Sequence, residues 1–201
     1  IEVLVKCAEE NQLQVVFFNA ETVFESCAAE EKNRSYKNYY KRNGDYRRVY
    51  TGEELFVAFI QNWDFKPSAC LLFVDRMFLQ NTGLRFYSNI YHEDNLFTIC
   101  LMQKADRCML CDQTLYRRLI REASIVSGEK NVKHAYGFFV CHREILKAYG
   151  QQKHSYAYYS ALRKYLKSMQ NQAVNAVAGK EYEYLLEQIT LVDGNEAGAF
   201  L

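Results

Sequence analysis

Hydrophobic and polar positions follow two different periods at the start of the chain. Apolar residues at positions 1, 4, 5 and 8 recur at helical spacing, which predicts an amphipathic helix over Ile1–Asn11. The run Val15–Phe18 is continuously apolar and predicts a short buried strand. Because an all-apolar strand is typical of a sheet covered on both faces, this succession favours an α/β architecture whose sheet begins upstream of residue 1.

Residues 34–50 form a polar segment with five tyrosines and six Lys or Arg residues. Asn43 and Gly44 form a turn signal between its two arms, which predicts an exposed hairpin or an ordered loop. Such a composition can stack on bases and contact phosphates, so RNA binding is one hypothesis for the segment. The other hypothesis is a flap that faces an acceptor molecule or a membrane.

Two helix signals follow this segment. Thr51 and Glu54 have the spacing of a capping box ahead of an apolar stripe, which predicts a helix over residues 52–62. The apolar stretch Cys70–Phe78 ends at the turn residues 81–83.

The remaining pattern predicts one more strand and several helices. Apolar positions 96, 97, 100, 101 and 105 predict a helix that begins at an acidic pair, and a β-like stretch follows over residues 107–117. Amphipathic helices are then expected at 131–149, 155–177 and 180–190. The fold class is therefore α/β: a partial sheet with flanking helices over residues 1–127, followed by a helical C-terminal extension over residues 128–201.

Composition narrows the class of protein. The 201 residues are 49% hydrophobic and include one proline, the balance of an ordered chain. Lys and Arg (25) nearly cancel Asp and Glu (24), so no global field attracts polyanions and we expect no nucleic-acid partner. No apolar run has the roughly 18 residues of a membrane helix, and no signal peptide precedes the first strand. The chain opens with Ile1, which is expected of a fragment.

The acidic pair Glu93 and Asp94 at a predicted helix start has two interpretations. A carboxylate there commonly caps the helix by accepting backbone N–H groups. The functional alternative is a general base at the edge of a cleft, beside His92. Spacing alone does not choose between them.

A cluster of cations follows the second predicted strand. Arg117, Arg118 and Arg121, with Ser124 close behind, have side chains suited to bidentate phosphate recognition. The alternative is a solvated basic edge.

Cysteine and histidine positions give weak signals. Cys108 and Cys111 are three residues apart on a predicted strand, where side chains point to opposite faces and do not chelate one ion. The seven scattered cysteines are expected to be reduced, buried thiols of a cytoplasmic protein. His134, His142 and His154 share no ligand spacing and are interpreted as structural.

Several motifs occur in an order that resembles the acceptor-side half of family-two glycosyltransferases, which have the GT-A fold. The resemblance covers about residues 1–127, and its motifs are Ser68–Leu79, Gly83–Phe86, Tyr91–Phe97, Ala105–Arg107 and Leu115–Arg118, with Arg121, Ser124 and Ile125.

The resemblance implies an enzyme that transfers a sugar from a nucleotide-diphospho-sugar donor to a glycan or lipid-linked acceptor with inversion. It implies Asp94 as the catalytic base and Glu93 as the residue that positions it or the acceptor. The substrate-binding residues that it implies are His92, Arg118, Arg121 and Ser124. The family holds a divalent metal, Mg²⁺ or Mn²⁺, through an Asp-x-Asp motif that this sequence lacks. The nucleotide-binding half is therefore expected upstream, and this chain alone is expected to bind no metal and to be inactive.

The resulting functional expectation is a bacterial enzyme of cell-surface polysaccharide synthesis, cytoplasmic and peripheral at the inner face of the membrane. Exposed tyrosines and cations over Lys153–Lys167 would permit membrane docking, and a solvated helix face is the alternative. A second functional hypothesis is a non-catalytic carbohydrate-binding or assembly module.

Overall fold

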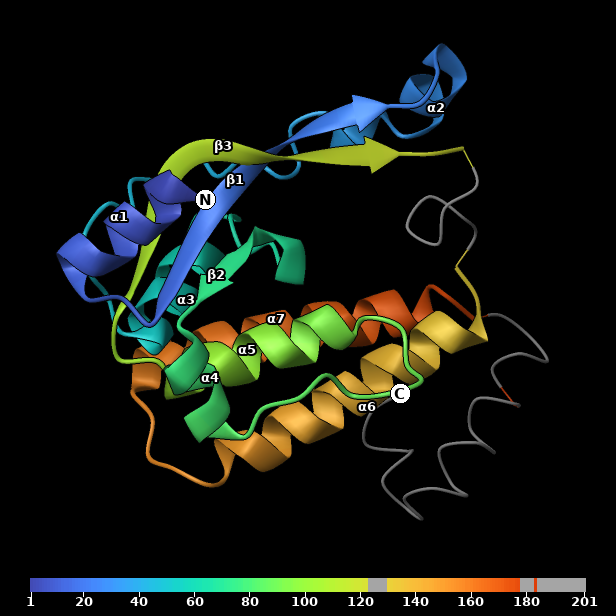
Figure 1. The fold of residues 1–201 in the computed structure, drawn as a ribbon. Coiled ribbons are helices and arrows are strands. Elements are labelled where there is room, and N and C mark those ends of the chain that lie inside the picture. Colours follow the sequence, from blue (N-terminus) through green and yellow to red (C-terminus); the bar gives the residue numbers. More distant parts are fainter. Residues whose placement is uncertain (123–129, 178–182, 184–201) are drawn as a thin grey trace. The chain divides into compact units, whose positions relative to one another are not determined.

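The protein is a mixed α/β chain, as its hydrophobic pattern predicts. The computed structural model describes residues 1–122, 130–177 and 183. In chain order its elements are α1 (Glu2–Asn11), β1 (Val15–Phe24), α2 (Cys27–Lys32), η1 (Arg34–Tyr36), α3 (Gly52–Gln61), η2 (Ala69–Leu71), β2 (Leu72–Val74), α4 (Arg76–Thr82), α5 (Glu93–Lys104), β3 (Cys108–Ile120), α6 (Val132–Tyr149) and α7 (Tyr156–Val174) (Figure 1).

The described residues pack into two compact units. The first contains residues 1–84 and 101–122, and the second contains residues 85–100 and 130–177. Segment 85–100 therefore packs with the C-terminal helices, although it lies far from them in the sequence. The boundary expected at residue 127 falls outside the described residues and stays a prediction, as does the helix expected over 180–190, of which only residue 183 is described.

A three-stranded mixed sheet organises the first unit. Its order is β2-β1-β3, with β2 antiparallel and β3 parallel to the central β1 (Figure 1). The strand predicted at Val15–Phe18 continues to Phe24 because β3 pairs with it along its whole length, up to Ile120 opposite Phe24. Its second half is partly exposed, so hydrophobicity alone does not predict it.

Both faces of the inner half of β1 are covered, as its apolar sequence predicts. Val16 and Phe18 point to a core cluster that includes Leu4 of α1. On the other face the ring of Phe17 meets the edge of the Phe59 ring of α3, with centroids 5.4 Å apart. Alternate residues of one strand therefore bind two different helices to the sheet.

Helix α3 begins at the predicted capping box. The Thr51 hydroxyl accepts the N–H of Glu54, and the Glu54 carboxylate accepts the N–H of Thr51. A Cβ on Gly52 would lie 2.0 Å from the carbonyl oxygen of Met102, so the first helical position must be glycine. This contact sets the approach of α3 to the end of α5.

Segment 34–50 is an ordered loop, one of the two structures that the sequence predicts, and it is not an exposed hairpin. It forms η1, several turns and one bridge of Tyr50 to the start of β3. The N–H groups of Asn43 and Gly44 both donate to the buried carboxylate of Asp64, at 2.9 Å each. The turn is thus tied to the core, and three of the five tyrosines of the segment are buried: Tyr40, Tyr46 and Tyr50.

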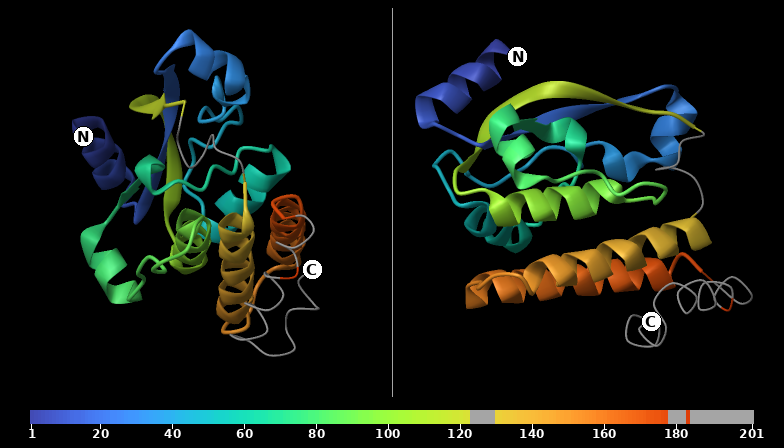
Figure 2. Two further views of the ribbon diagram at one scale, coloured as in Figure 1. Left: turned by 90° about the vertical axis from the view of Figure 1, so that its right-hand side faces the viewer. Right: turned by 60° about the horizontal axis from the view of Figure 1, so that its bottom comes forward.

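The second unit contains an antiparallel helical pair. Helices α6 and α7 lie side by side and are joined by the short connection 150–155 (Figures 1 and 2). The predictions of helices over 131–149 and 155–177 are confirmed, apart from the last three residues of the second. Both helices begin at a side-chain cap, Asn131 for α6 and Ser155 for α7.

No helix within the described ranges combines the length and hydropathy that a membrane span requires.

Candidate functional site

The acidic pair occupies the first turn of α5, as the sequence predicts. Glu93 and Asp94 are both half-buried there. The positive end of the helix dipole stabilises carboxylates at this position. A half-buried carboxylate that solvent and substrate can still reach is suited to accept a proton.

The backbone of His92 fixes the start of this helix. His92 has a φ of 68°, a left-handed conformation that is uncommon for a residue other than glycine. Its carbonyl oxygen accepts hydrogen bonds from the backbone N–H of Asn95 at 2.9 Å and from the Asn95 side chain at 3.2 Å. The thiol of Cys141 on α6 donates to the same oxygen at 3.3 Å.

The imidazole of His92 is held as a neutral group. Its ring stacks on Phe138, with centroids 3.8 Å apart and planes at 11°. The pKa of His92 is lowered to about 4, mainly by burial and to a smaller extent by His134 and Lys130. Its Nε2 is buried and has no hydrogen-bond partner within the described part of the chain. At neutral pH His92 therefore offers a substrate a neutral hydrogen-bonding ring and no charge.

Helices α6 and α7 support the residues around the acidic pair. A Cβ on Gly137 would lie 2.2 Å from the carbonyl oxygen of Tyr91, so the backbone before α5 lies directly on α6. The Tyr91 ring also packs against His134, with centroids 4.8 Å apart. Asn95 is buried and accepts a hydrogen bond from the Tyr165 hydroxyl of α7. The first turn of α5 is therefore fixed by contacts to two helices.

Arg118 lies half-buried on β3 beside Tyr40 and Tyr116. Burial would lower the pKa of Arg118, but the two neighbouring phenols outweigh it and raise that pKa. Its Nε is buried without a hydrogen-bond partner among the described residues. The guanidinium is therefore charged, and one of its donors is unused by the protein.

The other members of the predicted cationic cluster differ in role. Arg117 is exposed and its Nε lies 2.7 Å from the Glu21 carboxylate on β1, so it forms a cross-strand ion pair. Arg121 is exposed just after β3. Ser124 lies outside the described residues.

The candidate residues fall into the two units. His92, Glu93 and Asp94 are brought together in the second unit, and Arg118 and Arg121 belong to the first. That both groups line one cleft stays a prediction.

Two buried charged side chains that the sequence analysis missed, Arg42 and Asp64, hold the loop 34–50. Arg42 is 3% exposed and Asp64 is 1% exposed. The Arg42 guanidinium donates to the Phe18 carbonyl at 2.9 Å and lies over the Phe59 ring at 4.9 Å. Burial lowers the pKa of Arg42 to about 10, and Asp64 acts in the opposite direction. The only signal in the sequence is an acidic residue between two aromatic ones, just after a helix.

Three tyrosines of the same loop form an aromatic cluster. The Tyr39 ring contacts those of Tyr36 and Tyr40 edge to face, with centroids 5.4 and 4.9 Å away. The Lys66 ammonium lies 4.6 Å from the centre of the Tyr39 ring. Burial raises the pKa of Tyr39 to about 12, so its hydroxyl is protonated.

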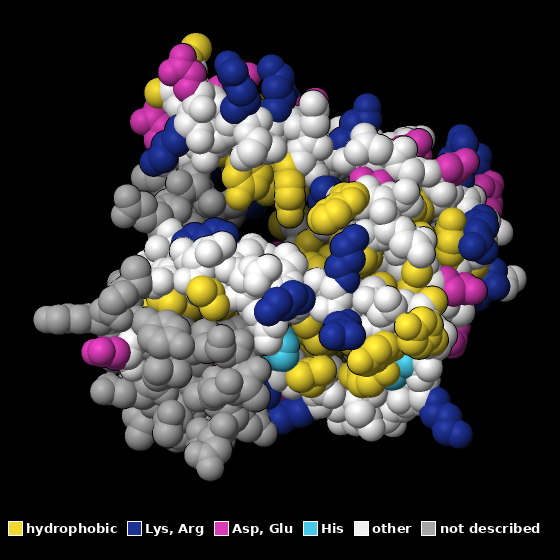
Figure 3. Space-filling model, turned by 180° about the vertical axis from the view of Figure 1, so that it is seen from behind, with side chains coloured by type: hydrophobic (Ala, Val, Ile, Leu, Met, Phe, Trp, Pro, Cys, Tyr) yellow, Lys and Arg dark blue, Asp and Glu magenta, His cyan; other side chains and the backbone are white. Residues whose placement is uncertain are grey.

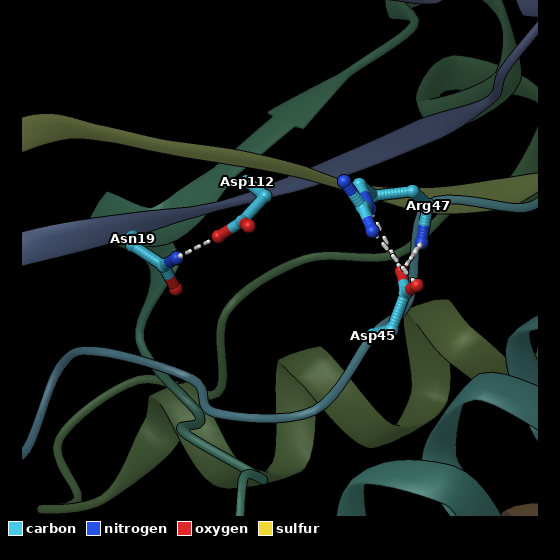
Figure 4. A network of polar contacts seen from close by, with 4 residues as sticks. All are labelled: Asn19, Asp45, Arg47 and Asp112. Carbon is cyan, nitrogen blue, oxygen red and sulfur yellow. Dashed lines mark hydrogen bonds and ion pairs between the residues drawn. The ribbon is translucent and has the colours of Figure 1, made fainter.

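A β-bulge lies where this loop meets the sheet. The register of β1 and β3 shifts on both sides of Asn19, which is buried. The Asn19 side chain donates to Asp112 at 3.2 Å (Figure 4). It also accepts the N–H of Arg42 at 3.1 Å. Figure 4 also shows the exposed pair of Asp45 and Arg47, 2.9 Å apart within the loop. Side-chain hydrogen bonds thus replace the backbone hydrogen bonds between β1 and β3 at the point where the regular pairing of the two strands is interrupted.

Four of the seven cysteines are buried, as predicted: Cys100, Cys108, Cys111 and Cys141. Cys27 and Cys70 are exposed, so the prediction of buried thiols is wrong for these two. Burial raises the pKa of Cys108 to about 12. Cys7 and Cys111 share a hydrogen bond across the core cluster, and burial raises the pKa of Cys7 to about 11. Over residues 1–122, 130–177 and 183, no group of three or more His, Cys, Asp or Glu side chains has the arrangement of a metal site.

The three remaining histidines have structural contacts. His134 is buried in the capping box of α6 with Asn131. A ring nitrogen of His154 lies 2.9 Å from the Tyr149 carbonyl oxygen. Burial lowers the pKa of His142.

Charged side chains are dispersed on the face that Figure 3 shows, which is turned by 180° from the view of Figure 1. Lys and Arg side chains there lie among hydrophobic and uncharged ones, and Asp and Glu side chains occur beside several of them (Figure 3). This distribution agrees with the formal net charge of +1 and gives no extended basic stripe on this face.

Comparison with known protein families and with curated protein sequences finds no match for this chain.

Proposed function

We propose that the chain is the acceptor-side and C-terminal part of an inverting glycosyltransferase of family two with a GT-A fold. The observation that carries the proposal is the acidic pair in the first turn of α5, half-buried and rigidly supported. The order of elements around it supports the same conclusion: β2 and α4 precede the pair, and β3 with Arg118 follows it. This is the order of the motifs on which the resemblance rests.

Asp94 acts as the base in this proposal. The acceptor hydroxyl oxygen attacks the anomeric carbon, and its proton passes to the Asp94 carboxylate. The bond from that carbon to the diphosphate oxygen breaks with its electron pair, so a nucleoside diphosphate leaves from the opposite face. One displacement inverts the anomeric centre. Glu93 positions Asp94 or the acceptor hydroxyl.

The departing diphosphate gains negative charge as the bond breaks. Arg118 and Arg121 supply fixed cations for it, because guanidinium groups bind phosphate oxygens with two parallel hydrogen bonds. His92 is neutral and therefore serves a hydroxyl or sugar oxygen better than a phosphate.

The divalent metal of the family does not fit the residues present here. The sequence contains no Asp-x-Asp, and the described residues form no metal-ligating group. Mg²⁺ or Mn²⁺ would have to be held by residues outside this chain, and no step above depends on it.

The test compares Asp94→Asn with the parent protein, joined to its nucleotide-binding half, across a panel of nucleotide sugars. Release of nucleoside diphosphate with a glycan acceptor should fall about 10²- to 10⁴-fold, the usual contribution of a general base. Asp106→Asn is the matched control, because Asp106 is an exposed carboxylate of the same protein. Transfer by Asp94→Asn at the parent rate would remove Asp94 from the mechanism.

A second candidate function is a non-catalytic carbohydrate-binding module. It is favoured by the exposed aromatic side chains of Trp63 and Tyr39 in the first unit. Glycan binding by the complete protein without any release of nucleoside diphosphate would decide for this alternative.

We place the enzyme at the cytoplasmic face of a bacterial membrane, in the synthesis of a surface polysaccharide or similar glycoconjugate. The sequence from residue 145 to residue 180 contains no Asp or Glu. On α7, the exposed residues Tyr156, Arg163 and Lys167 lie along one side of the helix. Such a face supports peripheral contact with anionic lipid.

A further inference from the structure

Trp63 is the single tryptophan of the chain, and its side chain is held in solvent. The residue is 76% exposed and lies just after the end of α3. Its φ is 59°, a left-handed conformation that a bulky side chain rarely adopts. Such conformations persist only where the surroundings impose them, and they concentrate at binding sites.

Three hydrogen bonds within the first unit hold the backbone around Trp63. The N–H of Trp63 donates to Ile60 at 3.4 Å, and the N–H of Asp64 donates to Phe59 at 2.8 Å. The Lys66 ammonium donates to the Trp63 carbonyl at 3.0 Å. Because the Asp64 carboxylate is also fixed in the core, the indole is presented from a rigid base.

The same ammonium connects Trp63 to a second exposed aromatic residue. Lys66 lies over the Tyr39 ring, which is 39% exposed and belongs to the tyrosine cluster. Two exposed amide side chains, Gln61 and Asn62, precede the tryptophan. The Lys66 ammonium therefore lies between the Trp63 backbone and the Tyr39 ring, and two exposed amide side chains stand beside the tryptophan in the chain.

We propose that Trp63, Tyr39 and Lys66 form a carbohydrate-binding surface, the aromatic platform, for the sugar residues of the acceptor. A pyranose ring has an apolar C–H face that packs on an indole and a rim of hydroxyl groups that hydrogen-bonds to amides and ammonium. The proposal rests on the proposed function, because it assigns the acceptor glycan to this platform. It adds a binding site remote in sequence from the acidic pair.

Carbohydrate fits this surface better than nucleic acid does. A base could stack on the indole, but a polynucleotide also needs a track of cations for its phosphates. Among the loop cations, Arg42 is buried, Arg47 is paired with Asp45, and Arg48 lies over the Tyr50 ring. Exposed Lys41 and the platform's own Lys66 are two cations and do not form a track along which a phosphate backbone could run.

The single tryptophan allows a direct test by intrinsic fluorescence of the 201-residue chain. The probes are cellohexaose and chitohexaose, titrated separately. We expect either or both to shift or quench the emission saturably, because only Trp63 reports. Ligand-observed NMR should then show binding about tenfold weaker in Trp63→Ala and mostly retained in Trp63→Phe, which keeps an aromatic face.

Tyr156→Ala is the matched control, because Tyr156 is 83% exposed but lies on α7 in the other unit. It should bind both probes as the parent does. Absence of any emission change with both sugars, or equal binding by Trp63→Ala and the parent, would overturn the proposal. A salt-sensitive emission change with poly(U) and none with the sugars would overturn it in favour of stacking on bases.

The outcome is separable from that of the proposed function. Sugar-dependent emission without any transfer by the complete protein would leave the platform standing and refute the enzyme. Transfer that depends on Asp94 with no emission change would refute the platform alone.

Discussion

Gly137 is the residue at which a single added methyl group should disturb the candidate site. It lies on α6, where the backbone of Tyr91 passes directly over the helix. Gly137→Ala places a Cβ 2.2 Å from the Tyr91 carbonyl oxygen, whereas ordinary contact begins at 3.4 Å. The contacted atom belongs to the backbone, so no side-chain rotation relieves the clash, and α6 and the segment before α5 must separate by about 1 Å.

Two opposing contributions determine how much Gly137→Ala changes the free energy of unfolding. Alanine is favoured over glycine inside a helix by about 1 kcal/mol. Overpacking of a close contact typically costs about 1–3 kcal/mol, and a clash with backbone belongs at the upper end. The expected net loss is about 1–2 kcal/mol of the free energy of unfolding. For a chain of this size it corresponds to a fall in Tm of roughly 2–8 °C.

Thermal unfolding followed by circular dichroism measures this effect, with Gly150→Ala as the matched control. A Cβ on Gly150 meets its nearest atoms at 3.7 Å and its φ is −68°, so alanine fits there without strain. Gly150→Ala should unfold at the parent temperature or above it. Equal Tm values for the Gly137 and Gly150 variants would refute the reasoning from the close approach. Under the proposed function, displacement of Asp94 by about 1 Å should also slow sugar transfer by up to about 100-fold.

Two further predictions concern the buried charges and the buried imidazole. Asp64→Ala removes the acceptor of the Asn43 and Gly44 N–H groups and of the Tyr46 hydroxyl. Leaving these three donors without a partner should cost about 3 kcal/mol or more in urea denaturation, at about 1–3 kcal/mol for each; a loss below about 1 kcal/mol would contradict the assigned role. His92 has a pKa of about 4 in the folded protein against 6.5 ordinarily, so between these values the unfolded chain takes up the proton first. Stability from this residue is therefore complete above pH 6.5 and falls as the pH drops toward 4. His92→Asn, which tolerates the left-handed backbone, should lose less stability than the parent between pH 7 and 4.5 in thermal scans, and an identical pH dependence would be the contrary result.

Local sequence signals were sufficient for the elements that depend on near neighbours. The capping box of Thr51 and Glu54 predicted the start of α3, and both of its hydrogen bonds are present. The apolar stripe behind the acidic pair predicted α5, and its observed start at Glu93 places the pair in the first turn. In each case the determining contacts lie within four residues, so the pattern contains them.

Elements that depend on distant partners were predicted poorly. The hairpin expected from Asn43 and Gly44 is absent because the turn donates both N–H groups to Asp64, about 20 residues later. The outer half of β1 is partly exposed, so its sequence has no continuous apolar run that would predict a strand. It is a strand because β3 pairs with it. Neither partner could be identified from the segment itself.

The same division applies to the candidate site. The chain pattern predicted the position of Asp94 on its helix, and it singled out Arg118 on its strand. It gave no indication that His92 would be neutral, since that follows from stacking on Phe138, 46 residues away. The sequence also gave no sign that Trp63 would be exposed, because an aromatic residue beside a helix end is ordinarily part of a core.

The buried side chains of Arg42 and Asp64 have a consequence for the way the loop 34–50 can change. These two buried side chains hold the backbone of the loop in place. Its exposed residues, such as Lys41, Arg47 and Arg48, take little part in folding. Mutations at those exposed positions should change the side chains on the surface without changing the backbone conformation of the loop. The loop is therefore a favourable place to build combinatorial libraries, in which new ligand preferences are selected on an unchanged backbone.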